Sequence, residues 1–259
     1  INDLAMRGAQ PFCLSLALIL EEGLPLAELE RVICSIGTAS NAAGVPIVTG
    51  DTKVVPKGKG DKIFINTSGI GSVAEDVCIS SAMAKEGDAI LLSGSMGDHG
   101  ITIMSRRAGL SLEGNLASDS APLHKLVAIL IKGLAPGSLH TLRDPTRGGV
   151  ATSLNEIAGA CGLQAEIDEA AIPIKSEVRA ACEIMGLDPF YLANEGKCLV
   201  LVDRDQADEA LRLMRATDVG SESALIGRLT RKTPGQVILR TTIGGSRIIT
   251  PLHLSLIHI

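Results

Sequence analysis

The sequence predicts a mixed α/β (α+β) fold. Short aliphatic segments suited to strands alternate with segments of helical periodicity, a pattern typical of sheets covered by helices rather than of helical bundles or β-sandwiches. Apolar residues make up 46% of the chain and aromatic residues only 2%, so the core must be aliphatic. The 259 residues exceed the roughly 100–200 of a typical domain, which favours two packed domains or one large one.

A helix is predicted between Pro25 and Gly44, because proline favours helix starts and glycine favours helix ends. Strands are predicted at residues 45–48, which should be buried, and at 62–70. We place a domain boundary at the Gly87–Asp88 turn, which gives domains of residues 1–86 and 87–253. The predicted apolar face of the helix consists of Leu26, Leu29, Ile33, Ile36 and Ala43.

Strands and helices alternate after this turn. The predicted strands cover residues 89–93, 139–142, 164–167, 198–202, 224–229 and 237–240. Five helices are predicted. The first begins after Gly100, the second covers residues 122–132 and the third begins at residues 146–149. The fourth ends at Gly186 and the fifth covers residues 206–216.

Composition excludes several classes of partner. A net charge of −5 gives no electrostatic reason to bind nucleic acid or an anionic membrane. The longest aliphatic run, residues 12–20, is shorter than the roughly 20 residues of a membrane helix. The six cysteines form no C-x-x-C pair, which indicates neither a zinc knuckle nor a disulfide framework and favours a reducing, cytoplasmic compartment.

Both ends of the sequence look unnatural. The chain begins at Ile1 without an initiator methionine, and residues 254–259 read LSLIHI, the translation of a transposon adapter used in sequencing libraries. The alternative for this hexapeptide is a genuine terminal strand. We interpret it as an adapter-derived tail and exclude it from the predicted fold.

Three polar clusters stand at predicted element ends, where binding residues concentrate. Residues 49–53 (TGDTK) should form a loop after the strand that ends at Val48, in which Asp51 and Lys53 bring a magnesium ligand and a cation to one phosphate. Residues 94–100 (GSMGDHG) should join a strand to a helix and point free N–H groups at an anion. The alternatives are an ordinary charged turn and, for His99, a turn residue rather than a metal ligand.

The third cluster, residues 143–149 (RDPTRGG), places an acid, a hydroxyl, a guanidinium and two glycines at a helix entrance, which suits phosphate binding. A helix N-cap at Asp144 or Thr146 explains it equally well. Glu195, just before a predicted strand, is a candidate base, although any turn can contain a glutamate. Together the clusters favour phosphate chemistry. No Walker loop or dinucleotide fingerprint occurs in the sequence.

Several strings carry a resemblance to a known family: NDLA at Asn2, SLALILEEGLP at residues 15–25, VTGDTKVV at 48–55, FINTSGIG at 64–71, GDHG at 97–100, RDPTRGGV at 143–150 and ANEGK at 193–197. They resemble HypE, the carbamoyl dehydratases of [NiFe]-hydrogenase maturation, in the superfamily of AIR synthase, selenophosphate synthetase and thiamine-monophosphate kinase. The resemblance runs from Ile1 to about His253.

This resemblance implies a two-domain AIR synthase-like (PurM-like) fold whose N-terminal domain is truncated here. It implies ATP and Mg²⁺ held where the domains meet, a homodimer formed through the first sheet, and the partners HypF and a HypC–HypD scaffold complex. The implied reaction dehydrates a C-terminal cysteine thiocarbamate to a thiocyanate, which supplies the cyanide ligand.

The resemblance also implies roles for particular residues. Lys53 would stabilise developing charge and Glu195 would act as base. The implied magnesium ligands are Asp3, Asp51 and Asp144. The implied nucleotide site comprises Asn2, Gly50, Thr52, Asp98, Thr146, Arg147, Gly148 and Gly149.

Two family features have no match in the sequence, namely an upstream glycine-rich loop and the carrier cysteine at the C-terminus. We therefore expect these 259 residues alone not to turn over. The alternatives are another ATP-dependent member of the superfamily, similar to selenophosphate synthetase or thiamine-monophosphate kinase, and a non-catalytic scaffold for maturation partners.

Overall fold

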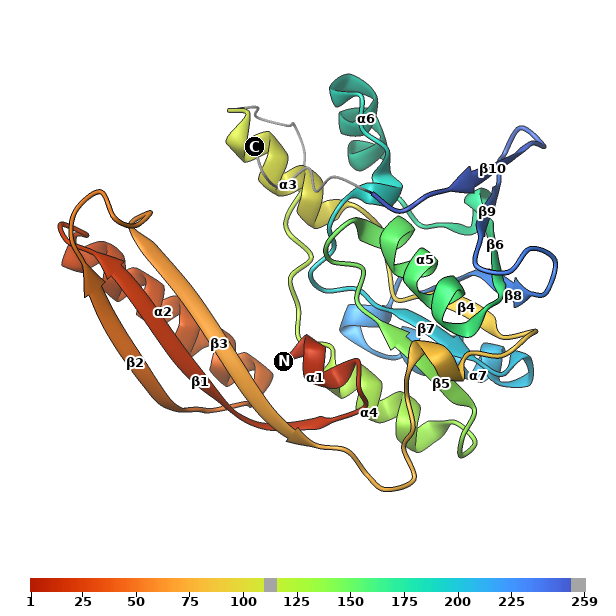
Figure 1. The fold of residues 1–259 in the computed structure, drawn as a ribbon, viewed down its shortest axis with the longest axis horizontal. Coiled ribbons are helices and arrows are strands. Elements are labelled where there is room, and N and C mark those ends of the chain that lie inside the picture. The colour runs from red at the N-terminus through yellow and green to blue at the C-terminus, as the bar shows by residue number, and fades with distance from the viewer. Residues whose placement is uncertain (110–115, 253–259) are drawn as a thin grey trace. The chain divides into compact units, whose positions relative to one another are not determined.

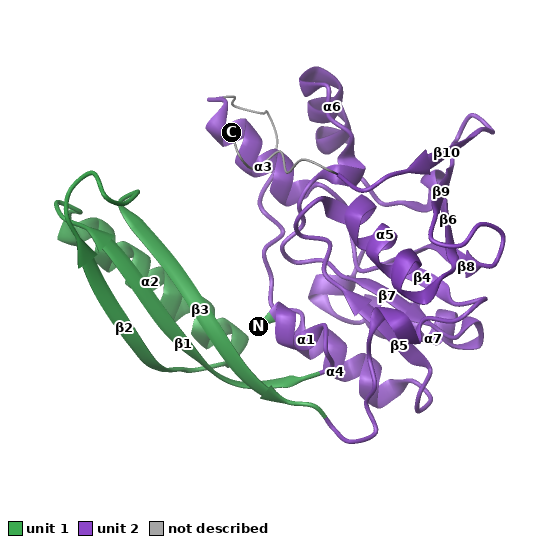
Figure 2. Ribbon diagram, in the orientation of Figure 1, with its two compact units in different colours: residues 1, 9–73 green, residues 2–8, 74–259 purple. Residues whose placement is uncertain are grey.

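The protein forms two compact units in a computed structural model that describes residues 1–109 and 116–252 (Figure 1). Unit 1 comprises Ile1 and residues 9–73, and unit 2 comprises residues 2–8 and 74–259 (Figure 2). The structure therefore divides the chain after residue 73, whereas the boundary predicted at Gly87 falls inside unit 2. The predicted adapter-derived tail lies outside the described residues.

Unit 1 is a three-stranded sheet in the order β2-β1-β3 with one helix. The central strand β1 (Gln10–Glu21) runs parallel to β2 (Ile47–Val55) and antiparallel to β3 (Ile63–Ser72). Helix α2 (Leu26–Ala43) joins the two parallel strands, because such strands need a crossover connection. Pro25 precedes this helix and Gly44 ends it at a φ of 70°, as predicted.

Of the predicted apolar face of α2, only Ala43 is fully buried. One prediction for unit 1 is wrong. The predicted strand at 45–48 begins later and runs on to Val55, so residues 49–53 lie within β2 and form no loop. Residues 49–53 pair with β1. Strand β1 contains the aliphatic run at residues 12–20, which was predicted only to be too short for a membrane helix. Among the described residues, no helix is long and apolar enough to cross a membrane.

Unit 2 contains a seven-stranded sheet in the order β10-β9-β6-β8-β4-β7-β5. Its strands are β4 (Ala89–Leu92), β5 (Leu139–Arg143), β6 (Gln164–Asp168), β7 (Leu199–Val202), β8 (Ala224–Thr230), β9 (Val237–Arg240) and β10 (Ser246–Ile249). Its helices are α1 (Asn2–Ala5), α3 (Asp98–Arg107), α4 (His124–Gly133), α5 (Gly149–Cys161), α6 (Ser176–Met185) and α7 (Ala207–Arg215). Short 3-10 turns occur at Ser81–Met83, Glu169–Ala171, Pro189–Tyr191, Arg204–Gln206 and Asp218–Gly220.

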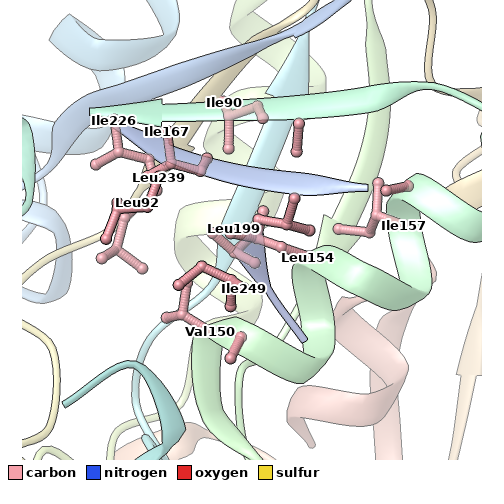
Figure 3. Close-up of a cluster of buried hydrophobic side chains, with 14 of the residues drawn as sticks. Ile90, Leu92, Val150, Leu154, Ile157, Ile167, Leu199, Ile226, Leu239 and Ile249 are labelled. Atoms are coloured by element: carbon pink, nitrogen blue, oxygen red, sulfur yellow. The ribbon is translucent and has the colours of Figure 1, made fainter. Parts of the chain in front are cut away.

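Helices cover both faces of this sheet. Helix α5 lays Val150, Leu154 and Ile157 against one face, where they meet strand side chains such as Leu92 and Leu199 (Figure 3). The spacing of four and three residues along α5 puts these side chains on one helical stripe. Residues that alternate with them along the strands, such as Leu91 and Val200, pack on the other face with α4 and α7. The predicted strands and helices of this half are confirmed, and β10 and α1 are additional.

The direction of β7 determines where the loops of unit 2 meet. Strand β7 lies between β4 and β5 and runs antiparallel to both. The ends of β4 and β5 and the start of β7 therefore share one edge of the sheet. This edge brings together the segments 93–97, 144–148 and 194–197.

Candidate functional site

Asn194 holds the three converging segments together. Its fully buried amide accepts a hydrogen bond from the backbone N–H of Gly97 at 2.8 Å. The same amide donates to the carbonyl oxygens of Pro145 and Leu192, at 3.2 and 2.9 Å. Because a buried amide is costly unless its groups are paired, Asn194 fixes the positions of the loops on either side of Glu195.

The backbone of Glu195 is held from both sides. Its N–H donates to Oδ1 of Asp119 at 2.9 Å, and its carbonyl accepts from Nδ2 of Asn2 at 3.1 Å. Asn2 also donates to the carbonyl of Ala121 and accepts from the N–H of Leu123. The predicted nucleotide residue Asn2 is thus engaged with protein backbone. It positions the candidate base.

Four carboxylates from separate segments gather at this edge. Asp3 comes from α1, Asp119 from the segment before α4, Asp144 from the loop after β5, and Glu195 from the turn before β7. Burial raises the pKa of Glu195, and the charges of Asp119, Asp144 and Asp3 raise it further, against an opposing effect of His99. The structure therefore brings together three predicted residues, Asp3, Asp144 and Glu195, and adds Asp119.

Asp144 is the most enclosed predicted metal ligand, with only 8% of its surface exposed. Burial raises the pKa of its carboxyl, and Asp3 and Glu156 raise it further, while Arg143 lowers it. Arg143 is held in turn by Glu156, with Nη2 2.6 Å from Oε2. Crowded carboxylates with raised pKa values are typical of functional sites.

This acidic cluster suits a hard divalent cation. Oδ2 of Asp119 is buried and has no hydrogen-bond partner among the described residues. A buried carboxylate oxygen without a partner is costly, and Mg²⁺ prefers oxygen ligands. Asp119 has no distinctive signal in the sequence, because an aspartate between two serines looks like any exposed loop.

The predicted residues of the 49–53 cluster belong to unit 1. Asp51 and Lys53 are exposed on β2, and their spacing of two residues puts them on one face of the sheet. Thr52 donates its backbone N–H to Oδ1 of Asp51 at 2.8 Å. A Cβ at Gly50 would lie 2.5 Å from the carbonyl oxygen of Leu16, so close packing against β1 explains this glycine without a ligand.

The segment 94–100 joins β4 to α3 as predicted, but three of its backbone N–H groups are engaged. Met96 donates to Pro173, Gly97 to Asn194, and Gly100 to Ala193. The prediction that this segment presents free N–H groups to an anion is therefore wrong for these three.

Asp98 was predicted to lie at the nucleotide, and its carboxylate is engaged with protein groups. Its Oδ2 accepts from Ser95 Oγ at 2.7 Å and from Lys175 Nζ at 2.6 Å, and the residue is only 2% exposed. Nδ1 of His99 lies 2.8 Å from Oγ of Ser118.

The backbone conformation and close packing explain why glycines occupy positions 148 and 149 of the 143–149 cluster. Gly148 and Gly149 have φ values of 73° and 62°, which other residues rarely adopt. A Cβ on Gly149 would lie 2.5 Å from the carbonyl oxygen of Phe190. Gly148 is the N-cap of α5, so the alternative of a cap at Asp144 or Thr146 is wrong. Thr146 accepts the N–H of Gly149, and Arg147 is exposed.

Lys197 is a second residue of this edge that has no predicted role. Its Nζ lies 3.0 Å from the position that a Cβ on Gly94 would take, so its ammonium covers the end of β4. The glycine at position 94 leaves the space for this side chain.

Comparison with known proteins places the chain among AIR synthase related proteins. The N-terminal domain of that family matches residues 1–73, and the C-terminal domain matches residues 85–240. The carbamoyl dehydratase HypE of Cupriavidus necator is 50% identical over 249 residues, which cover 96% of this chain and 70% of the relative.

Solved HypE structures are also similar to this chain. HypE in complex with ATP matches at a TM-score of 0.94 and 48% identity, over 98% of this chain and 77% of that one. The HypE–HypF complex matches at 0.92 and 45% identity, over 97% and 81%. Thiamine monophosphate kinase from Aquifex aeolicus, at 18% identity and a TM-score of 0.71 over 96% and 78%, shares the fold alone.

Proposed function

This chain belongs to the HypE family of hydrogenase maturation proteins, and from that premise we propose that it takes part in the ATP-dependent dehydration of a cysteine thiocarbamate to a thiocyanate. The product supplies the cyanide ligand of a [NiFe] hydrogenase. The observation that carries the proposal is the convergence of Asp3, Asp119, Asp144 and Glu195 around a turn that Asn194 and Asn2 hold in place.

The proposed chemistry removes one molecule of water from a primary thiocarbamate. ATP supplies the phosphoryl group that makes the amide oxygen a leaving group. Phosphorylation of the oxygen releases ADP and the first of the two nitrogen protons. The nitrogen then loses its second proton to Glu195 as phosphate departs with the oxygen and the nitrile forms. Burial raises the pKa of Glu195, which makes its ionised form a stronger base than a glutamate in water. Its anchored backbone N–H and carbonyl keep the carboxylate in one place.

The residues of unit 2 fit Mg²⁺ with ATP. Asp3, Asp144 and Asp119 offer carboxylate oxygens, and Asp119 Oδ2 has no protein hydrogen-bond partner among the described residues. Mg²⁺ would neutralise their mutual repulsion and the phosphate charge. We retain Asp51 as a further ligand, Lys53 as a charge-stabilising cation, and Gly50, Thr52, Asp98, Thr146, Arg147, Gly148 and Gly149 as residues near the nucleotide.

The test separates binding from turnover. Calorimetric titration of the 259-residue chain with ATP should show Mg²⁺-dependent binding that Asp144→Asn weakens. Glu209→Gln is the control, because this exposed glutamate of α7 pairs only with Arg212 in the ion pairs of the described residues. Equal binding of MgATP by Asp144→Asn and the control would refute the assignment of Asp144.

Turnover is measured in a chimera that adds the segments of the Cupriavidus necator relative lying outside the 249 matched residues. Loss of water from its carbamoylated cysteine is followed by mass spectrometry. Glu195→Gln should slow this step by about 10²- to 10⁴-fold while ATP binding persists. Unchanged dehydration by Glu195→Gln would exclude it as the base. Partner binding without any ATP requirement would favour a scaffold.

We propose the partners of the family for this chain as well, namely HypF, a HypC–HypD scaffold complex and a second copy of the chain, in the cytoplasm. A structure of HypE with HypF is known for a protein 45% identical. In unit 1, Ile19 pairs with Phe64 across β1 and β3, and the two side chains are 42% and 50% exposed. Sedimentation of Phe64→Glu tests the dimer, which this charge should dissociate.

A further inference from the structure

A second cluster of ligand-type side chains lies at the opposite edge of the sheet of unit 2. Asp88 precedes β4, His140 is the second residue of β5, and Asp203 follows β7. These three strands are neighbours, and β7 runs antiparallel to the other two (Figure 1). The cluster is therefore separated from the candidate site by the length of the strands, about four residues or ~13 Å.

The imidazole of His140 is buried and oriented. His140 and Asp88 are each 2% exposed, and Nδ1 of His140 lies 2.8 Å from Oδ2 of Asp88. A carboxylate accepts hydrogen bonds, so Nδ1 donates to Asp88, and an ammonium only donates, so Nε2 presents its lone pair to Nζ of Lys85. Oδ2 of Asp88 also accepts the backbone N–H of Lys85 at 2.7 Å, which fixes the carboxylate. A carboxylate that orients a histidine in this way is the usual support for a metal-binding imidazole.

The lone pair of Nε2 faces a position that already holds positive charge. Nζ of Lys85 lies 2.9 Å from Nε2, and Oδ1 of Asp203 lies 3.8 Å from it. The backbone N–H of Asp203 donates to the carbonyl of Ser138, so only its side chain has to adjust. One ligand atom from each of Asp88, His140 and Asp203 lies within 4.8 Å of the others.

We propose that Asp88, His140 and Asp203 form a binding site for a divalent transition metal of the Zn²⁺ class, and that the Lys85 ammonium is its built-in competitor. Nε2 of His140 and the carboxylate of Asp203 bind the ion, and Asp88 orients the ring. Zn–N and Zn–O bonds of about 2.0–2.2 Å put two ligands about 3.4 Å apart in a tetrahedral site. The half-exposed Asp203 reaches that separation with a shift of a few tenths of an ångström.

The competing explanation is that the cluster only fastens the turn before β4 to β5. In that case Lys85 is a required member of the network, and its removal should weaken the structure without creating metal affinity. In the metal site, Lys85 repels the ion, and its removal should strengthen binding. The effect of Lys85 on metal affinity therefore distinguishes the two explanations.

The test is titration with Co²⁺, which replaces Zn²⁺ and reports nitrogen and oxygen ligands through its visible absorption. The wild-type chain should bind Co²⁺ with a visible spectrum that His140→Gln removes. Lys85→Met should bind about tenfold more tightly, because the ion no longer displaces an ammonium. Asp203→Asn should bind more weakly. Asp144→Asn is the control, since it alters the acidic cluster and should leave the histidine-dependent spectrum unchanged.

Three results would overturn the proposal. The first is that Lys85→Met shows no histidine-dependent Co²⁺ spectrum. The second is that Lys85→Met and the double variant Lys85→Met/His140→Gln bind Co²⁺ equally. The third is that Asp144→Asn loses the spectrum. Because His140→Gln alters a buried residue, its urea unfolding is measured alongside. If the His140→Gln variant is unfolded, the Co²⁺ affinity of Asp203→Asn is the deciding measurement, because half-exposed Asp203 tolerates substitution. An affinity equal to that of the wild-type chain would refute the site.

Discussion

Replacing Asn194 with alanine should destabilise unit 2 by about 2–6 kcal/mol. The substitution leaves the N–H of Gly97 and the carbonyl of Leu192 without the partners that Asn194 provides, and each buried group without a partner costs roughly 1–3 kcal/mol. The carbonyl of Pro145 still accepts a hydrogen bond from the backbone N–H of residue 194, 3.1 Å away. Its loss of the Asn194 side chain therefore adds nothing to the cost. This loss is a large fraction of the ~5–15 kcal/mol stability of a typical domain.

The assay uses the natural fluorescence of the protein. The sequence contains one tyrosine and no tryptophan, and Tyr191 lies in unit 2, where its hydroxyl donates to the carbonyl of Thr250. Urea unfolding followed at this tyrosine therefore reports unit 2. The control is Asn155→Ala on α5, whose partly buried amide donates to Ala151 and Ile249. A loss below about 1 kcal/mol for Asn194→Ala, or one equal to the control, would refute the reasoning.

Three further predictions concern unit 2. Gly149→Ala should cost more than about 2 kcal/mol in urea unfolding, because its Cβ collides with backbone, whereas Gly159→Ala on the same helix, with open space around it, should be neutral or stabilising by up to ~1 kcal/mol. Asp144→Asn should raise the melting temperature at pH 7 while weakening MgATP binding. The raised pKa of Asp144 means that its contribution to stability is present below the ordinary value of 3.8 and is lost as pH rises, so the gain should vanish near pH 4; a gain that persists there would contradict the assignment. Glu166→Gln should lower stability at pH 7 by about 1 kcal/mol, since the hydrogen bond and charge of Lys232 and two arginines lower the pKa of this buried carboxyl. That deficit should shrink as pH falls through the lowered pKa, and a deficit independent of pH would show that the charge is irrelevant.

Local signals predicted much of unit 2. Helix α6 ends at Gly186 and β7 covers a continuous aliphatic run, because glycine and buried strands have patterns readable within a few residues. Unit 1 was harder. Residues 49–53 look like a loop because they are polar, yet they pair with β1 and are exposed on the sheet. A polar strand face has no local signature that distinguishes it from a turn.

The candidate site shows the same limit. Motifs selected Asp144 and Glu195, and the structure brings them close enough for their charges to interact. The residues that hold the site, Asn194 and Asp119, act through partners about 50 to 100 positions away. No spacing rule within one sequence encodes such contacts. Asn2, which the resemblance places in the nucleotide site, also donates hydrogen bonds to two backbone carbonyls that its motif does not reveal.

Strand β7 has a consequence for how this protein can change over evolution. Its four residues separate the turn that carries Glu195 from Asp203, and they lie between two strands of opposite direction. Adding or deleting one residue would turn every following side chain to the opposite face. Loops elsewhere can lengthen, but the length of this strand is constrained from both ends at once.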